Sequence, residues 1–153
     1  MAFEVSYRLQ ARGTDHALID TDELDRIYPV PPDLSQVTEQ TLRAMWGAFS
    51  EQGSRRLILV GVYLDRPSEL EWIARAIPNA RFTLVRLLAS HATLRERVMR
   101  REIGSGADAQ LERTRLQATA MRECESSVHA VETDGRSVTE TAELILERWP
   151  LST

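Results

Sequence analysis

The stretch Ala17-Leu18-Ile19-Asp20-Thr21-Asp22 decides how the rest of the chain is interpreted. Three apolar residues lead into an Asp-x-Asp pair, which predicts a short buried strand that presents two carboxylates at its C-terminal end. Ligands of open parallel sheets lie outside the carboxyl ends of the strands, so Asp20 and Asp22 are candidate site residues. A purely structural alternative is that Asp20 caps the strand and Asp22 caps the next helix.

Helical and strand patterns alternate along the chain, which predicts an α/β fold with a parallel sheet. The helix expected after the proline-rich loop at 28–33 has Leu42, Met45, Trp46 and Phe49 on one face. The apolar run at 57–62 is typical of a strand that is buried on both faces. We expect helices at 1–12, 35–52, 67–77, 90–102, 107–127 and 138–149, and strands at 17–21, 57–62, 82–87 and 129–133. The sequence shows no repeat or linker, so residues 1–153 are expected to form one domain.

The composition is that of a soluble globular protein, with 42% hydrophobic and 27% charged residues in 153. No apolar run is long enough for a membrane span, and the first residues lack the pattern of a signal peptide. Cys124 is the single cysteine, so no disulfide can form within the chain. A cytoplasmic location is therefore expected. The net charge of −4 argues against general nucleic-acid binding.

All 19 basic residues are arginines, and the chain contains no lysine. This excludes any mechanism that depends on a P-loop lysine or a lysine Schiff base. The three histidines, His16, His91 and His129, are far apart and lack short-spaced partner ligands, so no metal centre is expected from them.

Three segments together resemble the P-loop small-molecule kinases, a group that includes gluconate kinase, shikimate kinase, adenylylsulfate kinase and chloramphenicol phosphotransferase. The run 82–87 followed by 94–101 is similar to the fourth strand and the lid-entry helix of that group. The run 131–138 resembles its last strand and purine-side loop, and 17–22 resembles its second strand with an acidic pair. The resemblance implies a three-layer parallel sheet flanked by helices, ATP and Mg²⁺ as cofactors, and a small hydroxylated acceptor.

The resemblance also implies roles for individual residues. Asp20 and Asp22 would lie on the acceptor side, where one of them accepts or orients the proton of the substrate hydroxyl. Arg97 and Arg101, with Arg100, would lie at the lid and stabilise charge on the transferred phosphoryl group. The alternative for these arginines is a solvated helix face on which Glu96 pairs with Arg100.

On the purine side, the resemblance implies that Asp134, Gly135 and Arg136 border the adenine, with Gly135 allowing close approach and Arg136 stacking. An ordinary turn is the alternative for Asp134 and Gly135. Asp65, which follows the strand at 57–62, could serve Mg²⁺ weakly, because that strand ends without the usual acidic residue.

The family begins with a strand and a glycine-rich loop, G-x-x-x-x-G-K-[ST], that holds phosphates at a helix N-terminus. The helix expected at 1–12 resembles the helix that follows this loop, so the first strand and the loop are absent. Three explanations remain. Met1 is an internal methionine of a protein roughly 15 to 20 residues longer, the segment has been lost, or the resemblance is accidental. The first is favoured.

The family places its first strand between the third and fourth strands of the sheet. Its absence would leave open strand edges that favour association into a homo-oligomer, unless 57–62 pairs directly with 82–87. The expected function is that of an ATP-dependent small-molecule phosphotransferase-like domain that is inactive without the phosphate-binding loop. The alternative is a non-catalytic domain that acts as an interaction module.

Overall fold

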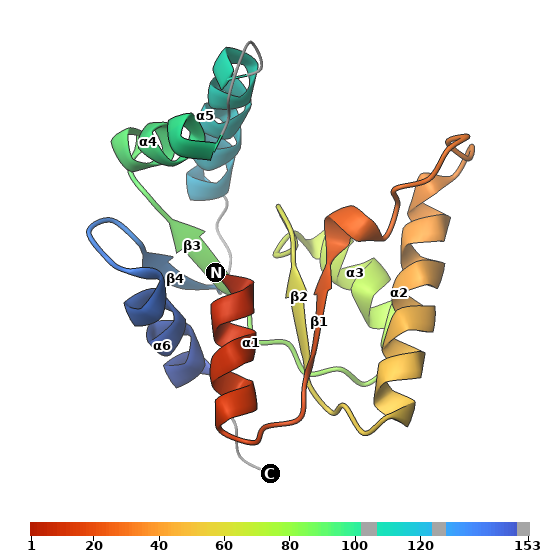
Figure 1. The fold of residues 1–153 in the computed structure, drawn as a ribbon. Coiled ribbons are helices and arrows are strands. Elements are labelled where there is room, and N and C mark those ends of the chain that lie inside the picture. Colours follow the sequence, from red (N-terminus) through yellow and green to blue (C-terminus); the bar gives the residue numbers. More distant parts are fainter. Residues whose placement is uncertain (102–106, 124–127, 150–153) are drawn as a thin grey trace. The chain divides into compact units, whose positions relative to one another are not determined.

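A computed structural model describes residues 1–101, 107–123 and 128–149 of the chain. Their contacts divide the chain into two compact units, Met1–Thr83 and Leu84–Thr153. In the described residues, each unit contains helices and a parallel pair of strands, which confirms the predicted α/β class with parallel strand pairing. Figure 1 labels the helices α1 to α6 and the strands β1 to β4 of these units.

The first unit contains a parallel pair of short strands with helices on both sides. Strands β1 (Ala17–Asp20) and β2 (Leu57–Val60) pair in a register that sets Ala17 opposite Leu57 and Asp20 opposite Val60. Figure 1 shows α1 on one side of the strands and α2 and α3 on the other. The helices are α1 (Ala2–Ala11), α2 (Leu34–Glu51) and α3 (Pro67–Ala76), and the 3-10 turn η1 covers Thr21–Glu23.

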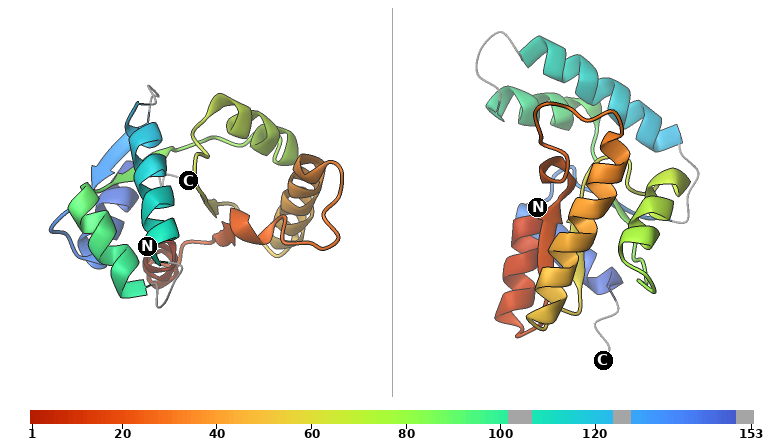
Figure 2. Two further views of the ribbon diagram at one scale, coloured as in Figure 1. Left: turned by 90° about the horizontal axis from the view of Figure 1, so that it is seen from above. Right: turned by 90° about the vertical axis from the view of Figure 1, so that its right-hand side faces the viewer.

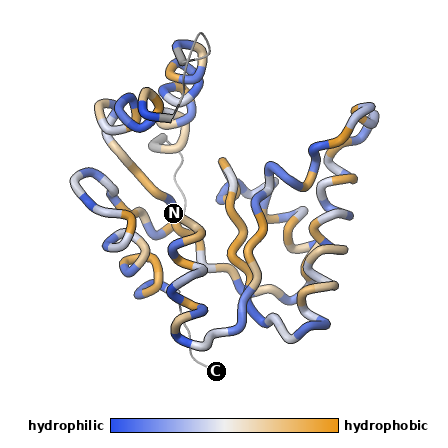
Figure 3. Tube along the Cα trace, in the orientation of Figure 1, coloured by the Kyte–Doolittle hydropathy of each residue, from blue (hydrophilic) through white to orange (hydrophobic). Residues whose placement is uncertain are grey.

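The core of the first unit lies between the strand pair and the helices α2 and α3. Because side chains alternate along a strand, Ile19, Leu57 and Leu59 share the face that packs against this core. The predicted stripe of α2 is confirmed, since Leu42 is fully buried and Met45, Trp46 and Phe49 pack around it. Figure 3 shows hydrophobic residues along most of both strands. The buried core residues are Ile19, Leu24, Leu42, Ile73, Ala76 and Ile77.

The second unit has a second parallel pair, β3 (Val85–Leu88) and β4 (His129–Glu132), with Val85 opposite His129. Helix α4 (His91–Arg101) packs against α5 (Ala107–Glu123), and Figure 2 shows the two helices side by side in both views. Helix α6 (Val138–Arg148) packs against β4 and buries Ala142 and Leu146. Ser137 and Glu140 form a capping box at its start.

Two predictions about the strands differ from the structure. β2 was expected to be buried on both faces, but all four of its residues are only half-buried, because β2 pairs with β1 alone in the described part of the chain. β3 begins at Val85 rather than Phe82, because its partner β4 begins opposite Val85 and Phe82 is exposed.

Among the described strands, β2 pairs with β1 and β3 pairs with β4, each within its own unit. The predicted helix ends at Glu102 and Ser127, and Cys124, lie outside the described residues. None of the described helices is long and apolar enough to cross a membrane.

Candidate functional site

Asp20 and Asp22 lie at the C-terminal end of β1, where the strand turns into η1. The Oδ1 atom of Asp20 accepts a hydrogen bond from the Asp22 backbone N–H at 3.1 Å, so Asp20 is the N-cap of η1. Both residues are exposed. Asp20, rather than Asp22, therefore caps the following helical turn. The Asp22 side chain is exposed to solvent and is accessible to a ligand.

The ends of the two strands of the first unit approach each other closely at Thr21 and Gly61. A Cβ atom built on Gly61 would overlap Thr21 Oγ1 and would lie 3.1 Å from Leu64 Cδ1. Gly61 thus lets the chain leave β2 directly beside the turn that carries Asp20 and Asp22. Asp65, the weak Mg²⁺ candidate, follows four residues later and is half-buried.

In the second unit, the predicted lid residue Arg97 is held by Thr133, which follows β4. Its guanidinium donates to Thr133 Oγ1 at 2.9 Å and to the Thr133 carbonyl at 3.1 Å. Thr133 is 3% exposed, and its own hydroxyl donates to the Leu88 carbonyl at 2.9 Å. The contact therefore joins α4 to the carboxyl ends of both strands.

Asp134, predicted on the purine side, lies beside this contact and caps α4. Both of its carboxylate oxygens accept the Ser90 backbone N–H, each at 3.0 Å. This bond, then the hydroxyls of Ser90 and Thr93, and last the charge of Arg97, lower the pKa of Asp134 below its ordinary value. The structure thus brings Arg97 and Asp134 together, with Asp134 held as an anion.

The other predicted residues of this unit are distributed around the same loop and helix. Gly135 has a positive φ of 67° in the turn after β4, and Arg136 is exposed next to it. Arg100 forms the alternative ion pair with Glu96, at 2.6 Å. The side chain of Arg101, the last residue of α4, lies outside the described part of the structure. Asp20 and Asp22 belong to the first unit, whereas these residues belong to the second.

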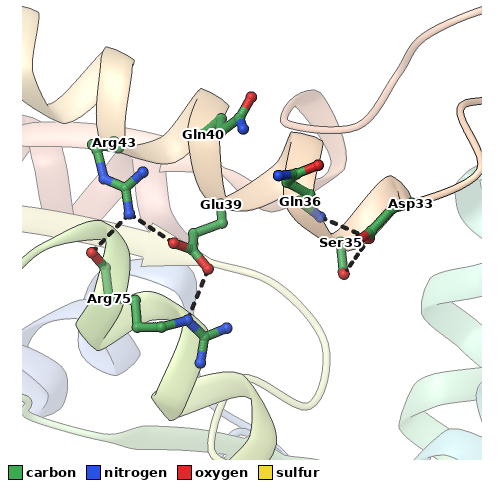
Figure 4. A pocket seen from close by; sticks show the side chains of 7 residues that line it. All are labelled: Asp33, Ser35, Gln36, Glu39, Gln40, Arg43 and Arg75. Carbon is green, nitrogen blue, oxygen red and sulfur yellow. Dashed lines mark hydrogen bonds and ion pairs between the residues drawn. The ribbon is translucent and has the colours of Figure 1, made fainter.

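A polar cavity of about 330 Å³ lies between α2 and α3 in the first unit and was not predicted from the sequence (Figure 4). At its centre, Glu39 accepts Arg43 Nη2 at 2.7 Å and Arg75 Nε at 2.9 Å. Bonds from Arg75 and then Arg43 lower the pKa of Glu39. The i, i+4 spacing of Glu39 and Arg43 is visible in the sequence. The ion pair of Glu39 with Arg75 could not be predicted, because it forms only when α3 packs against α2. The lining residues are Asp33, Ser35, Gln36, Glu39, Gln40, Arg43 and Arg75.

The N-cap of α2 forms one end of this cavity. Asp33 Oδ1 accepts the Ser35 hydroxyl at 2.6 Å and the Gln36 backbone N–H at 3.0 Å. These two bonds, in that order, lower the pKa of Asp33. The stiff loop at 28–33 therefore ends in a fixed cap.

Two of the arginines that the resemblance places at the lid, Arg97 and Arg100, already have partners within the protein. Arg97 is engaged by Thr133 and Arg100 by Glu96, and the chain contains no lysine. No group of three His, Cys, Asp or Glu side chains among the described residues is arranged to hold a metal ion.

No model of a known protein family matches the sequence, and no curated protein sequence matches it.

Proposed function

We propose that this chain is the part of a P-loop small-molecule kinase domain that follows the phosphate-binding loop. Its three-layer sheet would be completed by one strand between β2 and β3, and that strand would lead into the loop. The chain without this segment is then a phosphotransferase-like domain that does not bind the triphosphate. Its acceptor would be a small hydroxylated molecule.

The distribution of charge over the four strands carries this proposal. β1 ends at the exposed Asp20, and β4 contains the exposed residues His129 and Glu132. Exposed polar and charged residues protect the outer strands of a sheet, whereas inner strands of parallel sheets are apolar. β2 contains only Leu57, Ile58, Leu59 and Val60.

β3 also has the character of an inner strand. Its single charged residue, Arg86, donates to the Met121 carbonyl at 2.7 Å, so that this guanidinium is bonded within the protein. β1 and β4 thus resemble the two edges of one sheet, and β2 and β3 resemble strands that flank a missing centre. The pairings β1–β2 and β3–β4 are those that a sheet would keep if its middle strand were removed.

In this proposal Asp20 and Asp22 face the acceptor. Asp22 is the better candidate for receiving a proton, because Asp20 is already engaged as the cap of η1. The loop after β4, which contains Gly135 and Arg136, then lies beside the adenine. Arg97 and Asp134 hold this loop in place.

Calorimetry tests the phosphate-binding part of the proposal. The chain should bind MgATP with a Kd no tighter than about 1 mM, because an isolated purine-side loop supplies little binding energy. A micromolar Kd would contradict the view that the chain cannot hold the triphosphate.

The coding DNA upstream of Met1 tests the rest. The proposal predicts an in-frame strand followed by a glycine-rich loop that ends in Gly-Lys-Ser or Gly-Lys-Thr, and a stop codon next to Met1 would contradict it. In the extended protein, Asp22→Asn should lower kcat by about 10²- to 10⁴-fold. Glu23→Gln is the matched control, since Glu23 pairs only with Arg26 at the surface in the described contacts.

In the described part of the chain β2 pairs with β1 alone and β3 with β4 alone. This also favours a second function, that of a non-catalytic interaction module that captures an extended segment. This alternative predicts a stop codon next to Met1. If the coding sequence does continue upstream, it predicts that the longer chain binds ATP no better than this one.

A further inference from the structure

Ser6 and His16 form a close side-chain contact in the first unit that the proposed function does not use. Ser6 lies in the middle of α1, and His16 lies just before β1 begins at Ala17. Ser6 Oγ is 2.7 Å from His16 Nε2, and both residues are half-buried. The two side chains are therefore hydrogen-bonded and still partly accessible to solvent.

The second nitrogen of the imidazole ring fixes the roles in this contact. His16 Nδ1 lies 2.8 Å from the Thr14 carbonyl oxygen, which can only accept a hydrogen bond. Nδ1 therefore carries the proton of the neutral imidazole, and Nε2 presents its lone pair, a tautomer assigned from these bonding partners. It follows that the Ser6 hydroxyl donates to His16 Nε2.

The backbone on either side of His16 is anchored within the first unit. Thr14 N–H donates to the Leu9 carbonyl of α1 at 2.9 Å, and Ala17 N–H donates to the Arg56 carbonyl at 2.8 Å. The imidazole is thus carried by a short segment that is bonded to α1 before it and to the residue preceding β2 after it. All of these residues belong to the first unit, so this geometry does not depend on the second.

The direction of the Ser6 hydroxyl differs from that of two hydroxyls in α2. Thr38 Oγ1 donates to the Leu34 carbonyl at 3.0 Å, and Ser50 Oγ donates to the Gly47 carbonyl at 2.9 Å. Bonds of this kind to the preceding turn are common for serine and threonine within helices, and they engage the hydroxyl proton. The proton of Ser6 is directed to a base instead.

We propose that Ser6 is an activated nucleophile, with His16 as its general base and the Thr14 carbonyl as the group that orients the base. A hydroxyl within hydrogen-bond reach of a base that a third group orients is the arrangement that activates serine. The ligand class is a small carboxylic ester. The site is separate from Asp20 and Asp22, because His16 and Asp20 are about 13 Å apart along β1. It goes beyond the proposed function and uses no ATP.

The reaction at this site is an acyl transfer. Ser6 Oγ forms a bond to the carbonyl carbon of the ester while its proton moves to His16 Nε2. The bond between that carbon and the leaving oxygen then breaks, and the leaving alcohol takes the proton from Nε2. Attack by water on the acylated Ser6, with His16 again as base, releases the carboxylic acid and restores both residues.

Covalent labelling of the full chain tests the nucleophile. Diisopropyl fluorophosphate should form a bond between Ser6 Oγ and phosphorus with loss of fluoride, and peptide mapping by mass spectrometry locates the adduct. Ser50 is the matched control, since it is an exposed helical serine whose hydroxyl donates to a carbonyl. Ser6 should react at least about a hundredfold faster than Ser50, and His16→Gln should slow the reaction of Ser6 by about 10²- to 10⁴-fold.

Hydrolysis of p-nitrophenyl acetate tests the ligand class. The chain contains no lysine, so lysine amines do not contribute to the background reaction. Ser6→Ala and His16→Gln should each lower the rate by about tenfold or more, whereas Ser50→Ala should leave it unchanged. Circular dichroism and urea unfolding show whether each variant is folded, and the labelling of Ser6 in the original chain depends on no variant.

Three results would overturn the inference. They are the absence of an adduct at Ser6, a Ser6 adduct that forms equally fast in a folded His16→Gln protein, and ester hydrolysis that is as fast in Ser6→Ala as in the original chain. The first would mean that the contact only fastens α1 to the segment before β1, and the last that the imidazole itself attacks the ester. None of these results bears on the calorimetric test of ATP binding.

Discussion

The Arg97 guanidinium donates two hydrogen bonds to Thr133, one to the hydroxyl at 2.9 Å and one to the carbonyl at 3.1 Å. The two residues are 36 positions apart in the sequence. Thr133 is buried and in turn bonds Leu88 at the end of β3, so that one short chain of contacts fixes α4 to the strand pair. A residue placed at a lid by resemblance thus has a structural contact in this chain, whatever else it binds.

Thr133→Val should destabilise the second unit. The substitution keeps the shape of the side chain but removes the hydroxyl that accepts from Arg97 and donates to Leu88, so the free energy of unfolding should fall by about 1 to 3 kcal/mol. Urea unfolding followed by circular dichroism measures the change. Thr139→Val, at an exposed position of α6, is the control and should change the value by less than about 0.5 kcal/mol. Equal effects of the two substitutions would contradict the role of the Thr133 hydroxyl.

The helices could be predicted from the sequence because their signals are local. The spacing of Leu42, Met45, Trp46 and Phe49 defines the buried face of α2 without knowledge of any other element. The bounds of the strands were predicted less accurately. The start of β3, for example, depends on where β4 begins opposite it. The sequence also could not reveal that, among the described strands, β2 pairs with β1 alone and β3 with β4 alone.

The candidate site divides in the same way. Asp20 and Asp22 could be located from an apolar run that ends in two carboxylates, and the Glu96–Arg100 pair from its spacing. The contacts of Arg97 with Thr133, of Asp134 with Ser90 and of Glu39 with Arg75 join residues more than 30 positions apart. Such contacts depend on tertiary packing, which periodicity does not encode.

Acid should weaken the cap that Asp134 forms on α4. Its pKa is lowered in the folded state, so its contribution to stability is complete above the ordinary aspartate pKa of about 3.9 and is lost as the pH falls through the lower folded value. Asp134→Asn should therefore reduce stability at pH 7 and make the decline below about pH 4 shallower. Urea unfolding at a series of pH values measures both effects.

Glu71→Gln provides the control for the Asp134 experiment, because Glu71 is an exposed carboxylate on α3 in the other unit. This control shows how much stability is lost when one surface charge is removed, so that any larger effect of Asp134→Asn can be assigned to the loss of the cap on α4. An Asp134→Asn profile that runs parallel to the original one through the acid range would contradict the lowered pKa.

Glu39→Gln should weaken the packing of α3 on α2. The substitution removes the carboxylate that accepts Arg43 at 2.7 Å and Arg75 at 2.9 Å, and it leaves two guanidinium groups close together. Because both arginine side chains are more than half exposed, at 51% and 59%, the loss of stability should be small. It should shrink further in about 1 M salt, where the screening length is only about 3 Å. Thermal unfolding at low and high salt measures it. Glu51→Gln, exposed at the end of α2, is the control, and a salt-independent loss for Glu39→Gln would contradict an electrostatic cause.

Gly61→Ala should destabilise the first unit, because the added Cβ overlaps Thr21 Oγ1 and lies 3.1 Å from Leu64 Cδ1 and 3.2 Å from Leu64 Cγ. Crowding of this kind costs about 1 to 3 kcal/mol in packed regions. Gly47→Ala is the matched control. Gly47 lies within α2, and apart from its chain neighbours and the backbone of its own helix no atom lies within 4 Å of its added Cβ, so the same change should stabilise the protein by about 0.5 to 1 kcal/mol.

A double-mutant cycle with Thr21→Ala identifies the cause of the Gly61→Ala effect. If the overlap with the Thr21 hydroxyl is responsible, Gly61→Ala should be clearly less destabilising in the Thr21→Ala background, with a coupling energy of about 0.5 kcal/mol or more. Strict additivity would show that Leu64 or the backbone at Gly61 sets the penalty. A Gly61→Ala protein as stable as Gly47→Ala would show instead that the turn carrying Asp20 and Asp22 can move away from β2, and would remove the close approach on which this part of the candidate site depends.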